Sequence, residues 1–155
     1  MDEPLTHYHV GIVVADLVEA RARLTDVLGT VWGPIMRMDE VAYRDDAGTD
    51  VVLPTAICYS ASSPSIELIE ERPGTIWVRN PHSNLHHVAF WVDGLTEASG
   101  RMVTGGCPLQ LAGRDGDAAP VTFAYHRDEA LGVRFELVDA SMRDAMAFLF
   151  EPDGT

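Results

Sequence analysis

The sequence predicts an α+β fold in which two βαβββ modules in tandem form a curved mixed sheet around a central cleft, with a helix added at the C-terminus. The main observation is an internal repeat, because residues 8–17 recur in altered form at residues 86–95. The register is constant: 87 minus 9 is 78, and the same offset pairs Leu17 with Leu95. A repeated segment of this kind indicates a repeated structural unit.

The second observation is the order of elements in each copy, which is a strand, a helix and then several strands. From it we expect a first module over residues 1–70, a linker over 71–84, a second module over 85–140, and a C-terminal helix and tail over 141–155. Two prolines and a glycine in the linker favour irregular structure. The length of 155 residues fits one compact domain, or two small modules that share a core.

The first module opens with a strand at Tyr8–Val14, which is rich in β-branched residues. A helix follows, because Asp16 stands where an N-cap is expected and Glu19 lies in the first turn. Gly29 ends this helix. Three further strand-like stretches follow it: Val41–Arg44, Val51–Ser60 and Ser65–Glu70.

The second module repeats this order of elements. We expect a strand at His86–Val92, a helix at Leu95–Thr104, and strands at Val121–Tyr125 and Val133–Val138, the last two joined by a loop over His126–Gly132. Ser141 is then expected to cap a final helix with one apolar side, which offers a surface for dimerisation.

Composition narrows the range of partners. The net charge is −13, and all eleven basic residues are arginines. Such an acidic chain lacks the basic surface that nucleic acids and anionic membranes require. The absence of lysine also excludes Schiff-base chemistry. No apolar run approaches the ~20 residues that span a bilayer, and Cys58 and Cys107 have no paired spacing. We therefore expect a cytoplasmic protein with reduced thiols.

Each copy of the repeat carries one histidine and one glutamate. The histidines, His9 and His87, lie at the start of equivalent strands, and the glutamates, Glu67 and Glu136, lie in the closing strand of each module. If the modules pack about a pseudo-twofold axis, two imidazoles and two carboxylates meet in one cleft. The repeat therefore predicts one site built from both modules.

Small residues accompany the two histidines. Because side chains alternate along a strand, His9 shares a face with Gly11, and His87 shares one with Ala89 and Trp91. Gly11 and Ala89 leave room in front of the imidazoles. Two nitrogen and two oxygen ligands suit a divalent cation such as Zn²⁺, Ni²⁺, Co²⁺, Mn²⁺ or Fe²⁺, with open positions for water or substrate.

The segments that carry this pattern resemble the vicinal oxygen chelate superfamily, which includes glyoxalase I, methylmalonyl-CoA epimerase, bleomycin-resistance proteins and extradiol dioxygenases. These segments are His9–Val14, Ile66–Leu68, Leu85–Phe90 and Phe135–Leu137. The resemblance spans about Tyr8 to Asp139 and leaves out the C-terminal helix. It implies one divalent metal ion and a homodimer. It also implies metal ligands at His9, Glu67, His87 and Glu136, with Glu136 and Glu67 as the catalytic carboxylates.

The Leu85-His86-His87 pattern is closest to methylmalonyl-CoA epimerase, and it implies that His87 is the ligand. His86 is then a residue that supports the ligand or ends the strand. Asp39 and Glu40 lie near where an epimerase would place a second acid or base, and no motif assigns them a role.

Three residues are candidates for contact with substrate: Trp91, Tyr125 and His126. Trp91 shares a face with His87, whereas His126 lies where the epimerases carry a loop histidine and is equally well explained as an exposed loop residue. Other residues either line an apolar pocket or belong to the core: Trp32, Met36, Met38, Tyr43 and Phe123. Because the arginines are scattered, a small or hydrophobic carbonyl compound fits as well as a thioester.

Three functions are compatible with this pattern. The first is a metal-dependent enzyme that moves a proton next to a carbonyl, either an epimerase or isomerase or a glyoxalase-like lyase. The second is a protein that binds or sequesters a small molecule without chemistry. The third is an Fe²⁺ dioxygenase, which the second glutamate disfavours.

Overall fold

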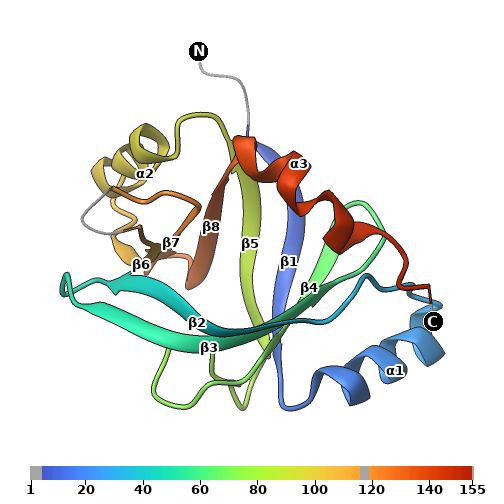
Figure 1. Ribbon diagram of the computed structural model, residues 1–155. Helices are drawn as coiled ribbons and strands as arrows, with labels where there is room; N and C mark the ends of the chain where they lie inside the picture. Colours follow the sequence, from blue (N-terminus) through green and yellow to red (C-terminus); the bar gives the residue numbers. More distant parts are fainter. Residues whose placement is uncertain (1–4, 116–118, 155) are drawn as a thin grey trace.

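The structure is a computed structural model of the chain, and it describes residues 5–115 and 119–154. It confirms the predicted α+β class: a curved mixed sheet closes around an axis, and helices lie outside it (Figure 1). The strands are β1 (Thr6–Val14), β2 (Met36–Asp45), β3 (Asp50–Tyr59), β4 (Ser65–Glu70), β5 (Leu85–Val92), β6 (Leu109–Gly113), β7 (Phe123–Asp128) and β8 (Val133–Asp139). The helices are α1 (Leu17–Leu28), α2 (Leu95–Thr104) and α3 (Arg143–Met146).

Strand pairing gives the sheet an approximate twofold symmetry. The order is β1-β4-β3-β2-β6-β7-β8-β5, and β5 returns to pair with β1. The two modules meet twice through antiparallel pairs, β1 with β5 around Val10 and Val88, and β2 with β6 around Arg44 and Ala112. Within each module the first and last strands pair in parallel, β1 with β4 and β5 with β8. Equivalent residues of the two modules therefore face one interior.

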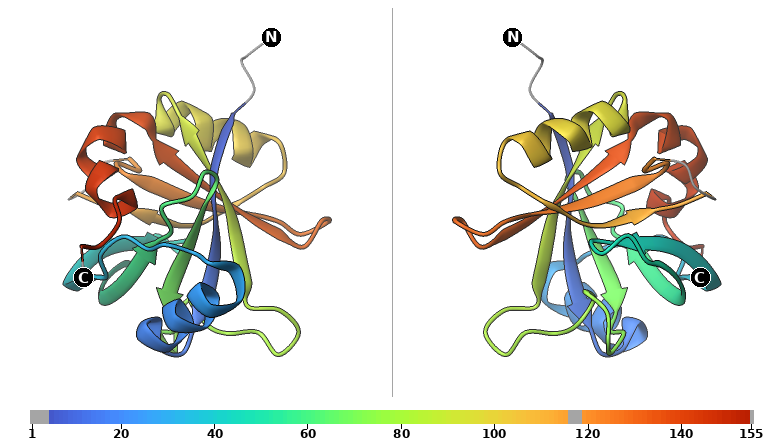
Figure 2. Two further views of the ribbon diagram at one scale, coloured as in Figure 1. Left: turned by 90° about the vertical axis from the view of Figure 1, so that its right-hand side faces the viewer. Right: turned by 90° about the vertical axis from the view of Figure 1, so that its left-hand side faces the viewer.

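Helices α1 and α2 lie at opposite ends of the molecule, as the two side views show (Figure 2). Asp16 caps α1 by accepting a 2.8 Å hydrogen bond from the Glu19 amide, as predicted. Gly29 ends α1 with a φ of 68°, a left-handed conformation that glycine adopts without strain. Leu17 anchors α1 against Leu68 and its neighbours on the sheet.

Several elements differ from the prediction. Strand β2 begins at Met36 rather than Val41, and strand β6, which was not predicted, is short and directly follows Pro108. Strand β7 runs to Asp128, through residues expected to form a loop, because its pairing with β8 continues to Val133. In the linker, Trp77 is buried in the core beside Tyr43 and Tyr125.

The C-terminal segment is one turn of α-helix (α3) between two 3₁₀ turns, Ala140–Met142 and Ala147–Phe150. Asp139, rather than Ser141, caps its start by accepting a bond from the Ser141 amide. Its apolar side packs on the chain's own sheet, against Tyr8 and Val138. This side is therefore not the free dimerisation surface that we expected. Among the described residues, no helix has the length and apolar character that crossing a membrane requires.

Candidate metal centre

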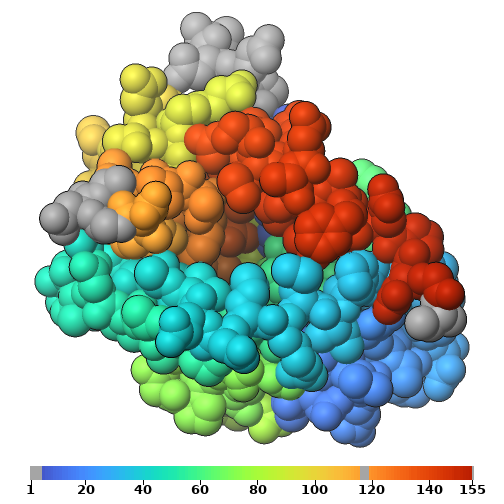
Figure 3. All heavy atoms as spheres, in the orientation of Figure 1, coloured from blue at the N-terminus to red at the C-terminus, as the bar shows by residue number. Residues whose placement is uncertain are grey.

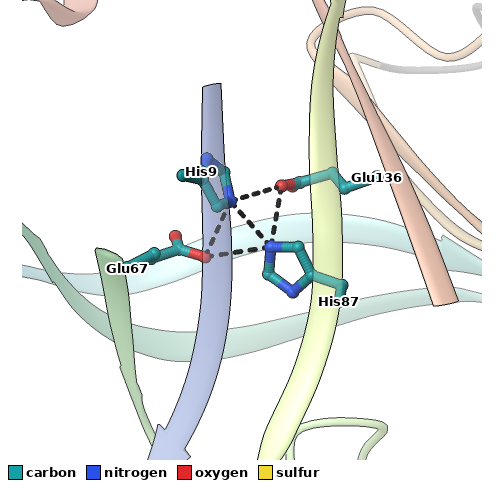
Figure 4. A group of neighbouring side chains, drawn as sticks. All are labelled: His9, Glu67, His87 and Glu136. Carbon is teal, nitrogen blue, oxygen red and sulfur yellow. Dashed lines mark hydrogen bonds and ion pairs between the residues drawn. The ribbon is translucent and has the colours of Figure 1, made fainter. Parts of the chain in front are cut away.

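The strand registers bring the four predicted ligands to one point. On β1 and β5, His9 pairs with Ala89 and Gly11 pairs with His87. On the parallel pairs, Gly11 lies beside Glu67 and Ala89 lies beside Glu136. Each small residue is thus flanked by the histidine of the other module. Figure 4 shows the four side chains converging from β1, β4, β5 and β8.

Gly11 makes the space that the His87 ring occupies. A Cβ atom at Gly11 would lie 2.0 Å from Cε1 and 2.3 Å from Nδ1 of His87, far inside van der Waals contact. Gly11 was predicted to leave room in front of the imidazoles, and the structure shows that the histidine of the opposite module occupies this room.

The facing atoms have the spacing of metal ligands. Glu136 Oε2 lies 3.1 Å from Nε2 of both His9 and His87, and Glu67 Oε2 lies 3.4 and 3.3 Å from the same two atoms. The two Nε2 atoms are 2.7 Å apart. Two ligands at right angles on a cation with bonds of about 2.1 Å are about 3.0 Å apart, so these four side chains could hold one divalent ion.

Burial supports the same conclusion. The exposed fractions of His9, Glu67, His87 and Glu136 are 0, 4, 1 and 6%. Glu67 Oε2 and Glu136 Oε2 are buried, and they face the Nε2 atoms of His9 and His87. Buried carboxylates are costly unless they are paired with a cationic group or coordinate a metal. The donor set present therefore fits a divalent cation.

The four groups also shift each other's protonation. Burial alone would lower the pKa of His87, but the charge of Glu136 and hydrogen bonds to both glutamates outweigh it and raise this pKa to about 9. Burial would raise the carboxyl pKa values of Glu67 and Glu136, but His9 and His87 lower both. Two carboxylates thus remain anionic around a proton held at the imidazoles, where a cation would replace that proton.

His86 supports His87 from behind. His86 Nε2 lies 2.9 Å from the Ile76 carbonyl oxygen, which can only accept, so this nitrogen carries the proton. Burial lowers the pKa of His86 to about 3 and keeps its ring neutral. His86 Nδ1 therefore accepts from Nδ1–H of His87, 2.9 Å away, and in neutral His87 the lone pair of Nε2 points to the centre. His9 Nδ1 is buried and has no such partner among the described residues.

Each glutamate also faces a tyrosine on the neighbouring strand. Tyr59 pairs with Glu67 and Tyr125 pairs with Glu136, so the tyrosines occupy equivalent positions in the two modules. Tyr59 Oη donates a 2.6 Å hydrogen bond to Glu67 Oε1. Burial, together with the charges of the glutamates, raises the pKa of both phenols, so both remain protonated.

A cavity of about 330 Å³ opens onto Glu67 and Glu136. The described residues that line it are mainly apolar, and these two glutamates are the charged groups among them. The C-terminal segment forms one wall through Met142, Met146 and Leu149. Figure 3 shows a hollow between this segment (red), β2 (cyan) and the orange region of β7 and β8.

Several predicted pocket residues do line this cavity: Met36, Met38, Tyr43, Phe123 and Tyr125. Trp32 does not line it and belongs to the core around α1. Asp39 and Glu40 are exposed at a bulge of β2 and lie outside the cavity.

Two of the three residues predicted to contact substrate lie outside this cavity. Trp91 is covered by Tyr8, whose ring stacks on it with centroids 3.9 Å apart, and it does not line the cavity. His126 is fully buried rather than on a loop, and its ring lies between the Cys107 carbonyl oxygen and Ser99 Oγ, each 3.0 Å away. Because neighbours on a strand face opposite sides, Tyr125 reaches the cavity and His126 does not.

Sequence reasoning missed three aromatic residues of the cavity: Tyr8, Tyr59 and Trp77. For Tyr59 a signal existed, because a second tyrosine, Tyr125, precedes the glutamate of the other module. Trp77 lies in a segment without periodicity, so its burial depends on tertiary packing alone.

Comparisons with known proteins agree with this architecture. A family model described as the Glyoxalase/Bleomycin resistance protein/Dioxygenase superfamily matches residues 8–125. No curated protein sequence matches the chain at a significant level.

Solved structures share its fold. Methylmalonyl-CoA epimerase from Mycobacterium tuberculosis has a TM-score of 0.59 and 22% identity over 90% of this chain and 91% of its own. The Streptomyces coelicolor methylmalonyl-CoA epimerase in complex with 2-nitronate-propionyl-CoA has a TM-score of 0.62 and 16% identity over 89% and 99%. A hypothetical protein from Bacillus halodurans has a TM-score of 0.57 and 17% identity over 88% and 95%.

At these identities the solved structures establish the fold, whereas the family model covers most of the sequence. The chain therefore belongs to the glyoxalase/bleomycin resistance/dioxygenase superfamily, as the sequence pattern predicted.

Proposed function

We propose that this protein is a metal-dependent enzyme that transfers a proton at a carbon next to a substrate carbonyl, as an isomerase or epimerase or as a glyoxalase-like lyase. The observation that supports this most is the buried set of two imidazoles and two carboxylates at the base of an apolar cavity. A divalent cation held by His9, Glu67, His87 and Glu136 would polarise the carbonyl and stabilise negative charge that develops on its oxygen.

Glu136 is the better base of the two glutamates. The Tyr59 phenol donates to Glu67 Oε1, and a hydrogen bond to the carboxylate stabilises the anion and lowers its basicity. Both glutamates line the cavity, and the Oε2 atom of each faces the two imidazoles, so the hydrogen bond from Tyr59 is what distinguishes them. We therefore assign Glu136 as the group that takes a proton from a bound substrate.

Both removal and return of the proton are expected to use this end of the cavity. Asp39 and Glu40 follow the cavity residue Met38 in the sequence, but they are exposed and do not line the cavity. Among the described lining residues, Glu67 and Glu136 are the only carboxyl groups. This arrangement supports a reaction in which one carboxylate shuttles the proton.

Metal analysis of the purified protein tests the first half of the proposal. We expect close to one equivalent of a divalent metal in the wild type and strong loss in His9→Ala and His87→Ala, whereas His82→Ala, at an exposed histidine, retains the metal. If neither substitution at positions 9 and 87 lowers the metal content, the metal centre is refuted.

Hydrogen exchange tests the second half. Metal-loaded protein in deuterated water should place deuterium at the α-carbon of a carbonyl substrate, and Glu136→Gln should abolish this exchange. Glu40→Gln, at an exposed carboxylate, is the matched control. Tight ligand binding without exchange in the wild type would instead favour a protein that binds a small molecule without chemistry.

A further inference from the structure

The side chains that line the cavity above the proposed metal centre indicate which kind of ligand it accepts. Four methionines contribute to its walls: Met36 and Met38 from β2, and Met142 and Met146 from the C-terminal segment. Aromatic rings, including those of Trp77 and Phe123, form much of the rest. Methionine and aromatic side chains give an adaptable apolar surface that suits flat hydrophobic molecules.

The charged groups around the cavity restrict the class of ligand further. None of the described residues that line the cavity is an arginine, and the chain contains no lysine. The charged groups present there are the carboxylates of Glu67 and Glu136. An anionic ligand would lose its hydration in the cavity without meeting a protein cation, and the protein's net charge of −13 opposes its approach.

One polar group in the cavity has no partner. The Tyr8 hydroxyl is buried, has no hydrogen-bond partner among the described residues, and belongs to a residue that lines the cavity. The ring is held in place: it stacks on Trp91 at 3.9 Å and contacts the His9 ring edge-on at 4.3 Å. A buried hydroxyl without a partner is costly, and an oxygen atom of a bound ligand could accept its hydrogen bond.

We propose that the substrate of the reaction proposed above is an uncharged, largely apolar carbonyl compound, and that Tyr8 Oη donates the hydrogen bond that orients its oxygen. Calling the ligand a substrate rests on the proposed function. The selection of an uncharged ligand by the cavity does not depend on it. The volume of about 330 Å³ lies at the small end of the range of roughly 300–1,000 Å³ for small-molecule sites, which suits one or two fused rings.

The test measures binding of four probes to the full-length protein by isothermal titration calorimetry, in the metal-free and the Mn²⁺-loaded form. The probes are α-tetralone (an uncharged aromatic ketone), tetralin (the same rings without the carbonyl), 1-naphthoate (an anion of similar size) and acetyl-CoA. We expect metal-free protein to bind α-tetralone at least about tenfold more tightly than 1-naphthoate or acetyl-CoA.

Two pairs of comparisons separate the parts of the inference. Tyr8→Phe should weaken α-tetralone binding about five- to tenfold and leave tetralin binding within about twofold, because only the hydroxyl is lost. Met38→Arg places a cation in the cavity and should shift the preference toward 1-naphthoate. Ala42→Arg, at an exposed position of the same strand, should not.

The outcomes are distinct from those for the metal centre. Failure of α-tetralone to bind, or tighter binding of 1-naphthoate or acetyl-CoA, overturns the ligand class. An equal loss of tetralin and α-tetralone binding in Tyr8→Phe overturns the hydrogen bond. A wild type that binds α-tetralone in this way but holds no divalent metal refutes the enzyme proposal and leaves the ligand class standing.

Discussion

The absence of a side chain at Gly11 is what allows the His87 imidazole to reach the centre of the molecule, since a Cβ atom there would lie 2.7 Å from His87 Nε2. The two residues belong to different modules and pair directly across β1 and β5. The candidate metal centre thus depends on this small residue as much as on the four side chains that could hold the ion.

Gly11→Ala is expected to displace the His87 ring and lower divalent metal affinity at least about tenfold, while the fold is retained with a loss of about 1–3 kcal/mol from overpacking. Titration of metal-free protein with Zn²⁺ in competition with a chelator measures the change. Gly100→Ala is the control, because it lies in α2 with open space around it and should leave affinity unchanged. Unaltered affinity in Gly11→Ala would contradict the placement of His87.

His86→Phe tests the support of His87 from behind. Phenylalanine keeps a ring against Tyr125 but removes the acceptor for His87 Nδ1–H and the donor to the Ile76 carbonyl. Loss of such a partner behind a ligand histidine costs about 10- to 100-fold in metal affinity. The same competition titration is used, with the exposed His82→Phe as control. An unchanged affinity in His86→Phe would show that His87 needs no such support.

Leu17→Ala is expected to destabilise the fold without touching the site. Leu17 is fully buried under α1, and truncation of a buried leucine costs about 2–5 kcal/mol. Val18, the next residue, is 62% exposed, so Val18→Ala should change stability by no more than about 0.5 kcal/mol. Urea denaturation measures both. A Leu17→Ala loss as small as that of Val18→Ala would contradict the packing of α1.

The internal repeat made the fold and the convergence of the four ligands predictable, because equivalent positions in a duplicated module must face the same interior. The repeat also distinguished His87 from His86, since the constant offset of 78 residues makes His87 the equivalent of His9. The alternation of side chains along a strand, applied to Tyr125 and His126, would have removed His126 from the cavity, but the strand was expected to end at Tyr125. The continued pairing with β8 corrects that boundary.

Other features depended on contacts that no local pattern encodes. Trp91 has the face predicted for it, yet Tyr8 stacks on that face and replaces it in the cavity. A bulge in β1 near His7 and His9 allows this, because it changes which side of the strand Tyr8 reaches. The apolar side of the C-terminal segment was readable from the sequence, but its position over the chain's own cavity follows from tertiary packing.

The metal-free protein should lose stability as pH rises from about 6.5 to 9. The pKa of His87 is raised from 6.5 to about 9 in the folded state, so its contribution is complete below pH 6.5 and is lost as pH rises through 9. The total is of the order of 3 kcal/mol. The pKa values of Glu67 and Glu136 are lowered, so their contributions are present above about pH 4.5 and are lost on further acidification.

Thermal unfolding of chelator-treated protein between pH 4 and 10 measures this profile. We expect the melting temperature to be highest near pH 6.5, because burial lowers the pKa of His86 to about 3 and this buried neutral ring costs stability as pH falls below 6.5. In the metal-loaded protein the melting temperature should instead rise between pH 6.5 and 9. The reason is that the cation competes with the proton at the imidazoles, so its affinity rises up to about tenfold per pH unit below pH 9. His82→Asn should follow the wild-type profile. A melting temperature that is flat or rises between pH 6.5 and 9 without metal would mean that no proton is held between His9 and His87, and the cluster would then lack the charge balance that a divalent cation is expected to restore.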